Sequence, residues 1–127
     1  MRRKLLLSAM AMALAWGSAN AADLQDFEVT SVTQLADLCG AGPEDALYVE
    51  AIQFCYGYIA GAAQFHSAVV GKGGLKPIAC PTRDATRSEF ADYFVSWART
   101  TATPEQRAEP AVQGMARAAA AKWPCPR

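Results

Sequence analysis

The stretch 46–70, ALYVEAIQFCYGYIAGAAQFHSAVV, decides the fold because it predicts one long helix. It contains no proline and no charged residue after Glu50. A step of 100° per residue places most of its apolar side chains on one face, namely Leu47, Ala51, Phe54, Cys55, Tyr58, Ala62, Phe65 and Val69. The opposite face carries small or neutral residues, so we expect neighbouring helices to surround this segment as the central element of the domain.

Within this helix, Gly57 and Gly61 are spaced by one helical turn. Small residues at this spacing let another backbone come close. We expect them to pack against a neighbouring segment of the same chain. The alternative is a seam between two copies of the protein.

Shorter helices are predicted on both sides of the long one. Ser31 with Gln34 forms a capping-box pattern that predicts a helix over 32–39, and Gly40 supplies its stop. The segment 23–29 before it is expected to be an extended arm. The turn 40–43 then leads into the long helix.

The second half of the chain shows similar signals. Thr86 with Glu89 predicts a helix over 87–100, and Pro110 opens a last helix that runs to Lys122. Thr103-Pro104 is a further helix-opening signal. No segment shows the alternation of a strand. The fold class is therefore all-α, a small disulfide-stabilised bundle of about four helices around a long central helix.

Four cysteines, Cys39, Cys55, Cys80 and Cys125, can form disulfides in three ways. A short helix that ends at Cys39, followed by a tight turn and an antiparallel helix, brings Cys39 toward Cys55. Cys80 and Cys125 then remain to join the loop before the third helix to the C-terminal tail. We therefore predict the pairs Cys39–Cys55 and Cys80–Cys125.

The first 21 residues have the features of an export signal. Arg2, Arg3 and Lys4 precede the apolar run 5–16, and Ala19-Asn20-Ala21 supplies a cleavage site. The apolar run is too short to serve as a stable membrane anchor. We expect a signal peptide at 1–21, a single helical domain at 22–127 and a periplasmic location, where disulfides form.

Removal of the signal leaves nine Lys and Arg against twelve Asp and Glu, a net charge of about −3. The basic residues are scattered along the chain. A nucleic-acid-binding protein would show a concentrated basic surface, so we expect no nucleic-acid partner.

The chain shows no catalytic or metal-binding pattern. His66 is the single histidine, and it follows Cys55 by eleven residues of one helix, which separates them by about 16 Å at 1.5 Å per residue. The cysteines lack the short paired spacings of a zinc site and the C-x-x-C-H pattern of covalent haem. We expect no enzyme activity, no metal and no cofactor.

The segment 71–77, GKGGLKP, predicts an exposed loop. Its glycines and lysines do not form a phosphate-binding loop, because the segment follows a helix and lacks the Lys-Ser or Lys-Thr ending. Lys72, Leu75 and Lys76 make it a candidate contact loop for a partner. The alternative is an ordinary solvated connection.

Four segments carry a family resemblance: FEVTSVTQLADLC (27–39), ALYVEAIQFCYGYIAGAAQFH (46–66), CPTRDATRSEFADYFVSWA (80–98) and EPAVQGMARAAAAKWPC (109–125). The most specific parts are Cys55-x-Gly57, Phe94-x-x-Trp97 and Trp123-Pro124-Cys125. Together they resemble the Rap/Tai immunity proteins, and the resemblance extends over about 23–125.

The resemblance implies a periplasmic immunity protein that binds and inhibits a peptidoglycan amidase, an effector of a type VI secretion system, by covering its active site. It also implies that the protein can be a homodimer. The family's architecture is related to that of periplasmic acid-stress chaperones. The alternative function is therefore a chaperone that exposes apolar surface when its carboxylates are protonated and then holds unfolded proteins.

Overall fold

The computed structural model describes residues 21–127. Within this range the chain is helical throughout and contains no strand, which confirms the all-α prediction. Residues 1–20 of the expected signal peptide lie outside the described range. The elements are the 3-10 helix η1 (Leu24–Glu28) and the α-helices α1 (Val32–Cys39), α2 (Tyr48–Gly71), α3 (Arg87–Thr100), α4 (Pro104–Ala108) and α5 (Ala111–Lys122).

Local capping explains why two helices have the predicted bounds. Ser31 and Gln34 form the capping box at the start of α1, and the Thr86 hydroxyl accepts the Glu89 N–H at 3.1 Å at the start of α3. The long helix α2 begins two residues later than predicted. The reason is that the Asp45 side chain accepts the Leu47 N–H at 2.9 Å and holds the preceding residues in a turn.

Two other segments differ from the prediction. The expected extended arm is wrong, because Asp23 and Asp26 form a capping box at the start of η1. The Thr103-Pro104 signal opens a helix of its own, α4, in which Gln106 completes the capping box with Thr103. The described domain therefore has five α-helices in place of about four.

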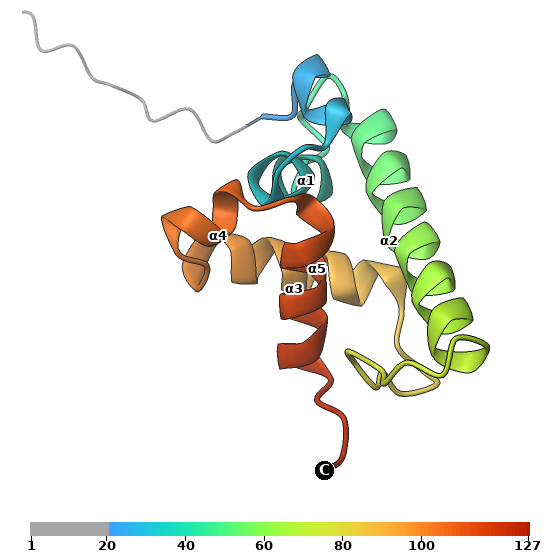
Figure 1. Cartoon of the computed structure of the whole chain (residues 1–127). Helices are drawn as coiled ribbons and strands as arrows, with labels where there is room; N and C mark the ends of the chain where they lie inside the picture. The colour runs from blue at the N-terminus through green and yellow to red at the C-terminus, as the bar shows by residue number, and fades with distance from the viewer. Residues whose placement is uncertain (1–20) are drawn as a thin grey trace, which may run out of the picture.

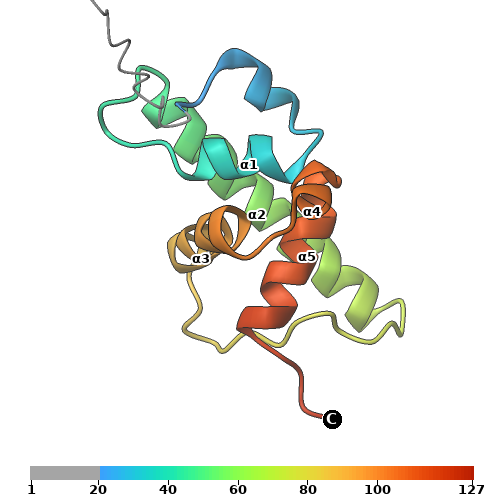
Figure 2. The ribbon, with the colours of Figure 1, turned by 90° about the vertical axis from the view of Figure 1, so that its left-hand side faces the viewer.

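The short helix α1 occupies the centre of the core. It packs against η1, α2, α3, α4 and α5, and Figure 2 shows it among these helices with α2 behind. Val32 and Leu35 of α1 are fully buried, as is Phe94 of α3. Helix α5 crosses α1 at Gly114, where any side chain would overlap with Val32. A glycine is favoured there because the branched side chain of the buried Val32 fills the space that a Cβ would occupy.

Helix α2 lies along one side of the domain (Figure 1). Its fully buried residues are Ala51, Cys55 and Ile59, a narrow stripe with a spacing of four. The expectation that neighbours surround this helix is therefore wrong. A helix of 24 residues extends about 36 Å, and none of its residues after Ile59 is buried, so the rest of the domain leaves its last turns largely uncovered.

The structure contains the disulfides Cys39–Cys55 and Cys80–Cys125, which is the pairing that helix geometry favoured. Such bonds persist in oxidising compartments and indicate that the protein works outside the cytoplasm. Within residues 21–127, none of the helices has the length and apolar character needed to span a membrane.

Candidate partner-binding site

The three residues proposed for partner contact lie together in the segment after α2. Lys72, Leu75 and Lys76 belong to the exposed loop 72–78, which Figure 1 shows at the projecting end of α2. Leu75 is 60% exposed. The structure thus places these side chains where a partner can reach them.

Two glycines shape the turn of this loop. A side chain at Gly73 would overlap with the Val69 carbonyl oxygen, and Gly74 has a φ of +65°, in the left-handed region that favours glycine. The Leu75 N–H then donates to the Val69 carbonyl at 3.4 Å. The turn therefore folds the loop back on the end of α2.

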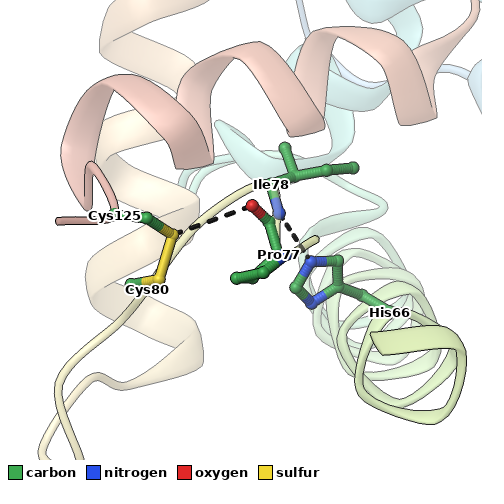
Figure 3. The surroundings of a disulfide bond; sticks show 5 residues. All are labelled: His66, Pro77, Ile78, Cys80 and Cys125. Carbon is green, nitrogen blue, oxygen red and sulfur yellow. Dashed lines mark hydrogen bonds between the residues drawn. A yellow bond between two sulfur atoms is a disulfide. The ribbon is translucent and has the colours of Figure 1, made fainter. Parts of the chain in front are cut away.

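The far end of the loop is fastened to two other elements. The Ile78 N–H donates to Nε2 of His66 on α2 at 3.0 Å (Figure 3). Two residues later, the Cys80 N–H donates to the Trp123 carbonyl at 2.9 Å, and Cys80 is bonded to Cys125. His66 is therefore a structural residue that helps to fix the base of the loop.

Two further large apolar side chains, close to the loop in the sequence, are also exposed. Phe65, in the last turns of α2, is 71% exposed, and Ile78 is 54% exposed. We call Phe65, Lys72, Leu75, Lys76 and Ile78 the loop surface. The sequence does not single out Phe65 or Ile78 as contact residues. Phe65 continues the apolar stripe of the long helix, which predicts a buried position. Exposed large apolar residues also occur elsewhere among the described residues, namely Leu24, Val49 and Val112, but three within 14 residues of the chain occur at this place alone.

The charges along the chain are segregated. Residues 51–83 contain Lys72, Lys76 and Arg83 and no acidic residue, whereas residues 22–50 contain seven acidic residues and no Lys or Arg. The loop surface therefore belongs to a basic segment of an otherwise acidic domain. Its electrostatic complement is an acidic surface on a partner.

The glycines of α2 do not have the expected packing role. A side chain at Gly57 or at Gly61 would find no atom within 4 Å, so the prediction of close packing within the chain is wrong. These positions lie on an exposed face of α2.

All four cysteines are in disulfides, so the chain has no thiolate nucleophile. No group of three or more His, Cys, Asp or Glu within 21–127 is placed to hold a metal ion. An open hollow of about 370 Å³ lies between the start of α2 and α3, and Tyr48, Ile52, Tyr56, Val95 and Arg99 are among its lining residues.

Comparison with known proteins identifies a family. The family model that describes the Rap1a immunity proteins matches residues 31–125. The match begins at the N-cap of α1 and ends at Cys125, so it includes both disulfides and the loop surface. No curated protein and no solved structure matches the chain.

Proposed function

Because the chain belongs to the Rap1a immunity protein family, we propose that it protects a cell by binding and inhibiting a peptidoglycan amidase of a type VI secretion system. We place this activity in the periplasm, where such an effector would reach its substrate. The observation that supports a binding role most directly is the loop surface. It is exposed, apolar and basic, and it is fastened at its base.

The loop surface has the physical properties of a preformed binding element. Its base is fixed by the disulfide and by the His66 hydrogen bond, so binding orders fewer residues and loses less conformational entropy. Leu75, Phe65 and Ile78 supply apolar area for burial. Lys72 and Lys76 supply positive charge for an acidic rim. A projecting element of this kind can enter a cleft and exclude the peptide substrate.

The experiment that tests this function is periplasmic co-expression with an amidase encoded beside the gene. We expect the immunity protein to restore growth and to form a stoichiometric complex with the purified amidase. If neither protection nor a complex is found with a neighbouring amidase, the proposed function is wrong.

A pair of matched variants tests the site separately from the function. Leu75→Glu places a charge on the loop surface, whereas Leu24→Glu does the same on η1, where Leu24 is 77% exposed. We expect Leu75→Glu to weaken the complex at least tenfold and Leu24→Glu to leave it unchanged. Equal effects would show that the amidase binds elsewhere on the protein.

We further propose that the exposed face of α2 at Gly57 and Gly61 pairs two copies into a homodimer. The absence of side chains at these positions would let a second α2 come close. Light scattering of Gly57→Gln compared with the unchanged protein tests this proposal, because a larger side chain at the seam is expected to produce a monomer.

A further inference from the structure

Ala22 is held in place by a hydrogen bond and by burial of its side chain. Its backbone N–H donates to Oδ2 of Asp45 at 2.8 Å, and its side chain is only 7% exposed. It packs in a small apolar cluster with Leu38 and Ala51. Because Asp45 lies in the turn before α2, this contact ties the beginning of the domain to the α1–α2 turn.

The anchored residue lies directly after the predicted cleavage site. Cleavage after Ala19-Asn20-Ala21 makes Ala22 the first residue. Ala21 is exposed, Ala22 is buried, and the side chain of Asp23 caps η1. The sequence motif and the structural anchor are independent observations, and they meet at the same peptide bond.

The charges around this anchor favour a cation. Residues 22–50 contain seven acidic residues and no Lys or Arg. Among the ion pairs of the described residues, Arg99 with Asp37 at 3.9 Å is the one that involves this acidic segment, and Asp45 is in none of them. The Asp45 carboxylate therefore has backbone N–H donors and no cationic side chain as its partner.

We propose that signal-peptide removal creates an ion pair between the new N-terminal ammonium of Ala22 and the carboxylate of Asp45. A signal peptidase hydrolyses the Ala21–Ala22 bond with one water molecule. The released peptide carries the Ala21 carboxylate, and the nitrogen of Ala22 becomes an α-ammonium. The precursor has a neutral amide at this place, so maturation converts an ordinary hydrogen bond into a charge-assisted one.

This inference does not depend on the amidase or on the family's activity. It assigns a structural role to the processing of the chain. An ammonium at Ala22 contributes a positive charge at the acidic end of the domain and fixes η1 and the α1–α2 turn to each other.

The first experiment determines where the exported protein begins. N-terminal sequencing of protein isolated from the periplasm is expected to start at Ala22. A start at any other residue would overturn the proposal, because the amine would then lie away from Asp45.

The second experiment measures the pKa of the α-amine from the pH dependence of its acylation rate. An N-terminal amine ordinarily has a pKa of about 7.7–8.0, and pairing with a carboxylate raises it. We expect the pKa in protein that starts at Ala22 to lie about one unit above that in Asp45→Asn. Glu44→Gln, which removes the neighbouring carboxylate, is the matched control and is expected to have a much smaller effect.

A variant with one extra glycine before Ala22 keeps Asp45 but moves the N-terminal ammonium away from its carboxylate. It therefore remains informative if Asp45→Asn does not fold. A raised amine pKa in the folded state stabilises the protein below pH 7.7 and loses this effect as the pH rises through the raised value. The Tm of the Ala22 form should exceed that of the glycine-extended form at pH 7 and equal it at pH 10. Equal Tm values at pH 7, or an amine pKa that Asp45→Asn leaves unchanged, would refute the ion pair.

Discussion

The two disulfides lie in regions of opposite character. Cys39–Cys55 is buried where α1 meets α2, and helix packing holds the same two elements together. Cys80–Cys125 lies near the surface, where it joins a loop to the C-terminal tail together with the hydrogen bond from the Cys80 N–H to the Trp123 carbonyl. One region is therefore fixed by its core and the other by a small number of specific bonds. The second region carries Phe65, Leu75 and Ile78, three of the exposed large apolar side chains of the described residues.

Two phenylalanines give the largest contrast between these regions. Phe94 is completely buried, whereas Phe65 is 71% exposed. We expect Phe94→Ala to lower the free energy of unfolding by about 3–5 kcal/mol, because it leaves a cavity in the core. Phe65→Ala should change it by less than about 0.5 kcal/mol. Urea unfolding measures both, and a similar loss in the two variants would show that the end of α2 is part of the core.

Removal of each disulfide separates stability from binding. In the chain-entropy model, bridges across 16 and 45 residues stabilise the fold by about 3 and 4 kcal/mol. We expect Cys39→Ala/Cys55→Ala and Cys80→Ala/Cys125→Ala to lose stability of this order. Only the second pair should also weaken the complex with the effector, because it releases the base of the loop.

Calorimetry of the complex, at a temperature where both double variants are folded, measures this difference. If the two variants bind equally well, the Cys80–Cys125 bridge stabilises the fold without organising the loop surface.

The charge of Asp37 has a smaller effect on stability, and the size of this effect depends on pH. Burial, with the carboxylate of Asp26 next in importance and Arg99 opposing, raises the pKa of Asp37 from 3.8 to about 6. Above pH 6 the charged carboxylate therefore destabilises the folded state, and this cost disappears as the pH falls toward 3.8. A shift of this size corresponds to about 3 kcal/mol.

We therefore expect Asp37→Asn to be more stable than the unchanged protein by about 2–3 kcal/mol at pH 7.5 and equal to it at pH 3. Urea unfolding at the two pH values measures this, with Asp92→Asn on the exposed side of α3 as the control. Asp37→Asn less stable at pH 7.5 would mean that the Arg99 pair outweighs the burial of the charge.

The same residue bears on the chaperone alternative. An acid-activated chaperone needs carboxylates whose protonation loosens the fold. Asp37 has the opposite effect, and the carboxylates whose pKa is lowered, Glu89 and Glu105, are exposed, so their interactions contribute little to stability. We therefore expect no suppression of the aggregation of unrelated proteins near pH 2–3. Strong suppression there, without a stoichiometric partner at neutral pH, would favour the chaperone.

The sequence predicted those features that depend on local chemistry. Ser31 and Thr86 begin their helices through side-chain hydrogen bonds to residues three positions away, and such patterns are visible in the sequence. The position of the long helix relative to the others was not predictable in this way. Periodicity shows that a helix has an apolar side, but the length of its neighbours decides how much of that side is buried.

The candidate site likewise combines features that the sequence predicts with features that depend on contacts between elements. Glycines and lysines marked the loop as exposed, and the structure bears this out. Phe65 was assigned to the core because it continues the apolar stripe of α2, yet the stripe extends past the end of the bundle. The bond from Ile78 to His66 joins residues on two different elements, and no spacing rule indicates such a contact.

Substitution of His66 is expected to have the smallest and most local effect on the difference between the two regions. His66→Ala removes the acceptor for the Ile78 N–H, a hydrogen bond at 3.0 Å in a partly exposed place. A bond of this kind contributes about 0.5–1 kcal/mol, so we expect hydrogen exchange at Ile78 to become about two- to fivefold faster while the core amides are unchanged. Gln64→Ala, an exposed change on the same helix, is the control. Faster exchange throughout α1 and α3 would contradict the separation between a core-fixed region and a bond-fixed loop, whereas a change confined to the loop would support it.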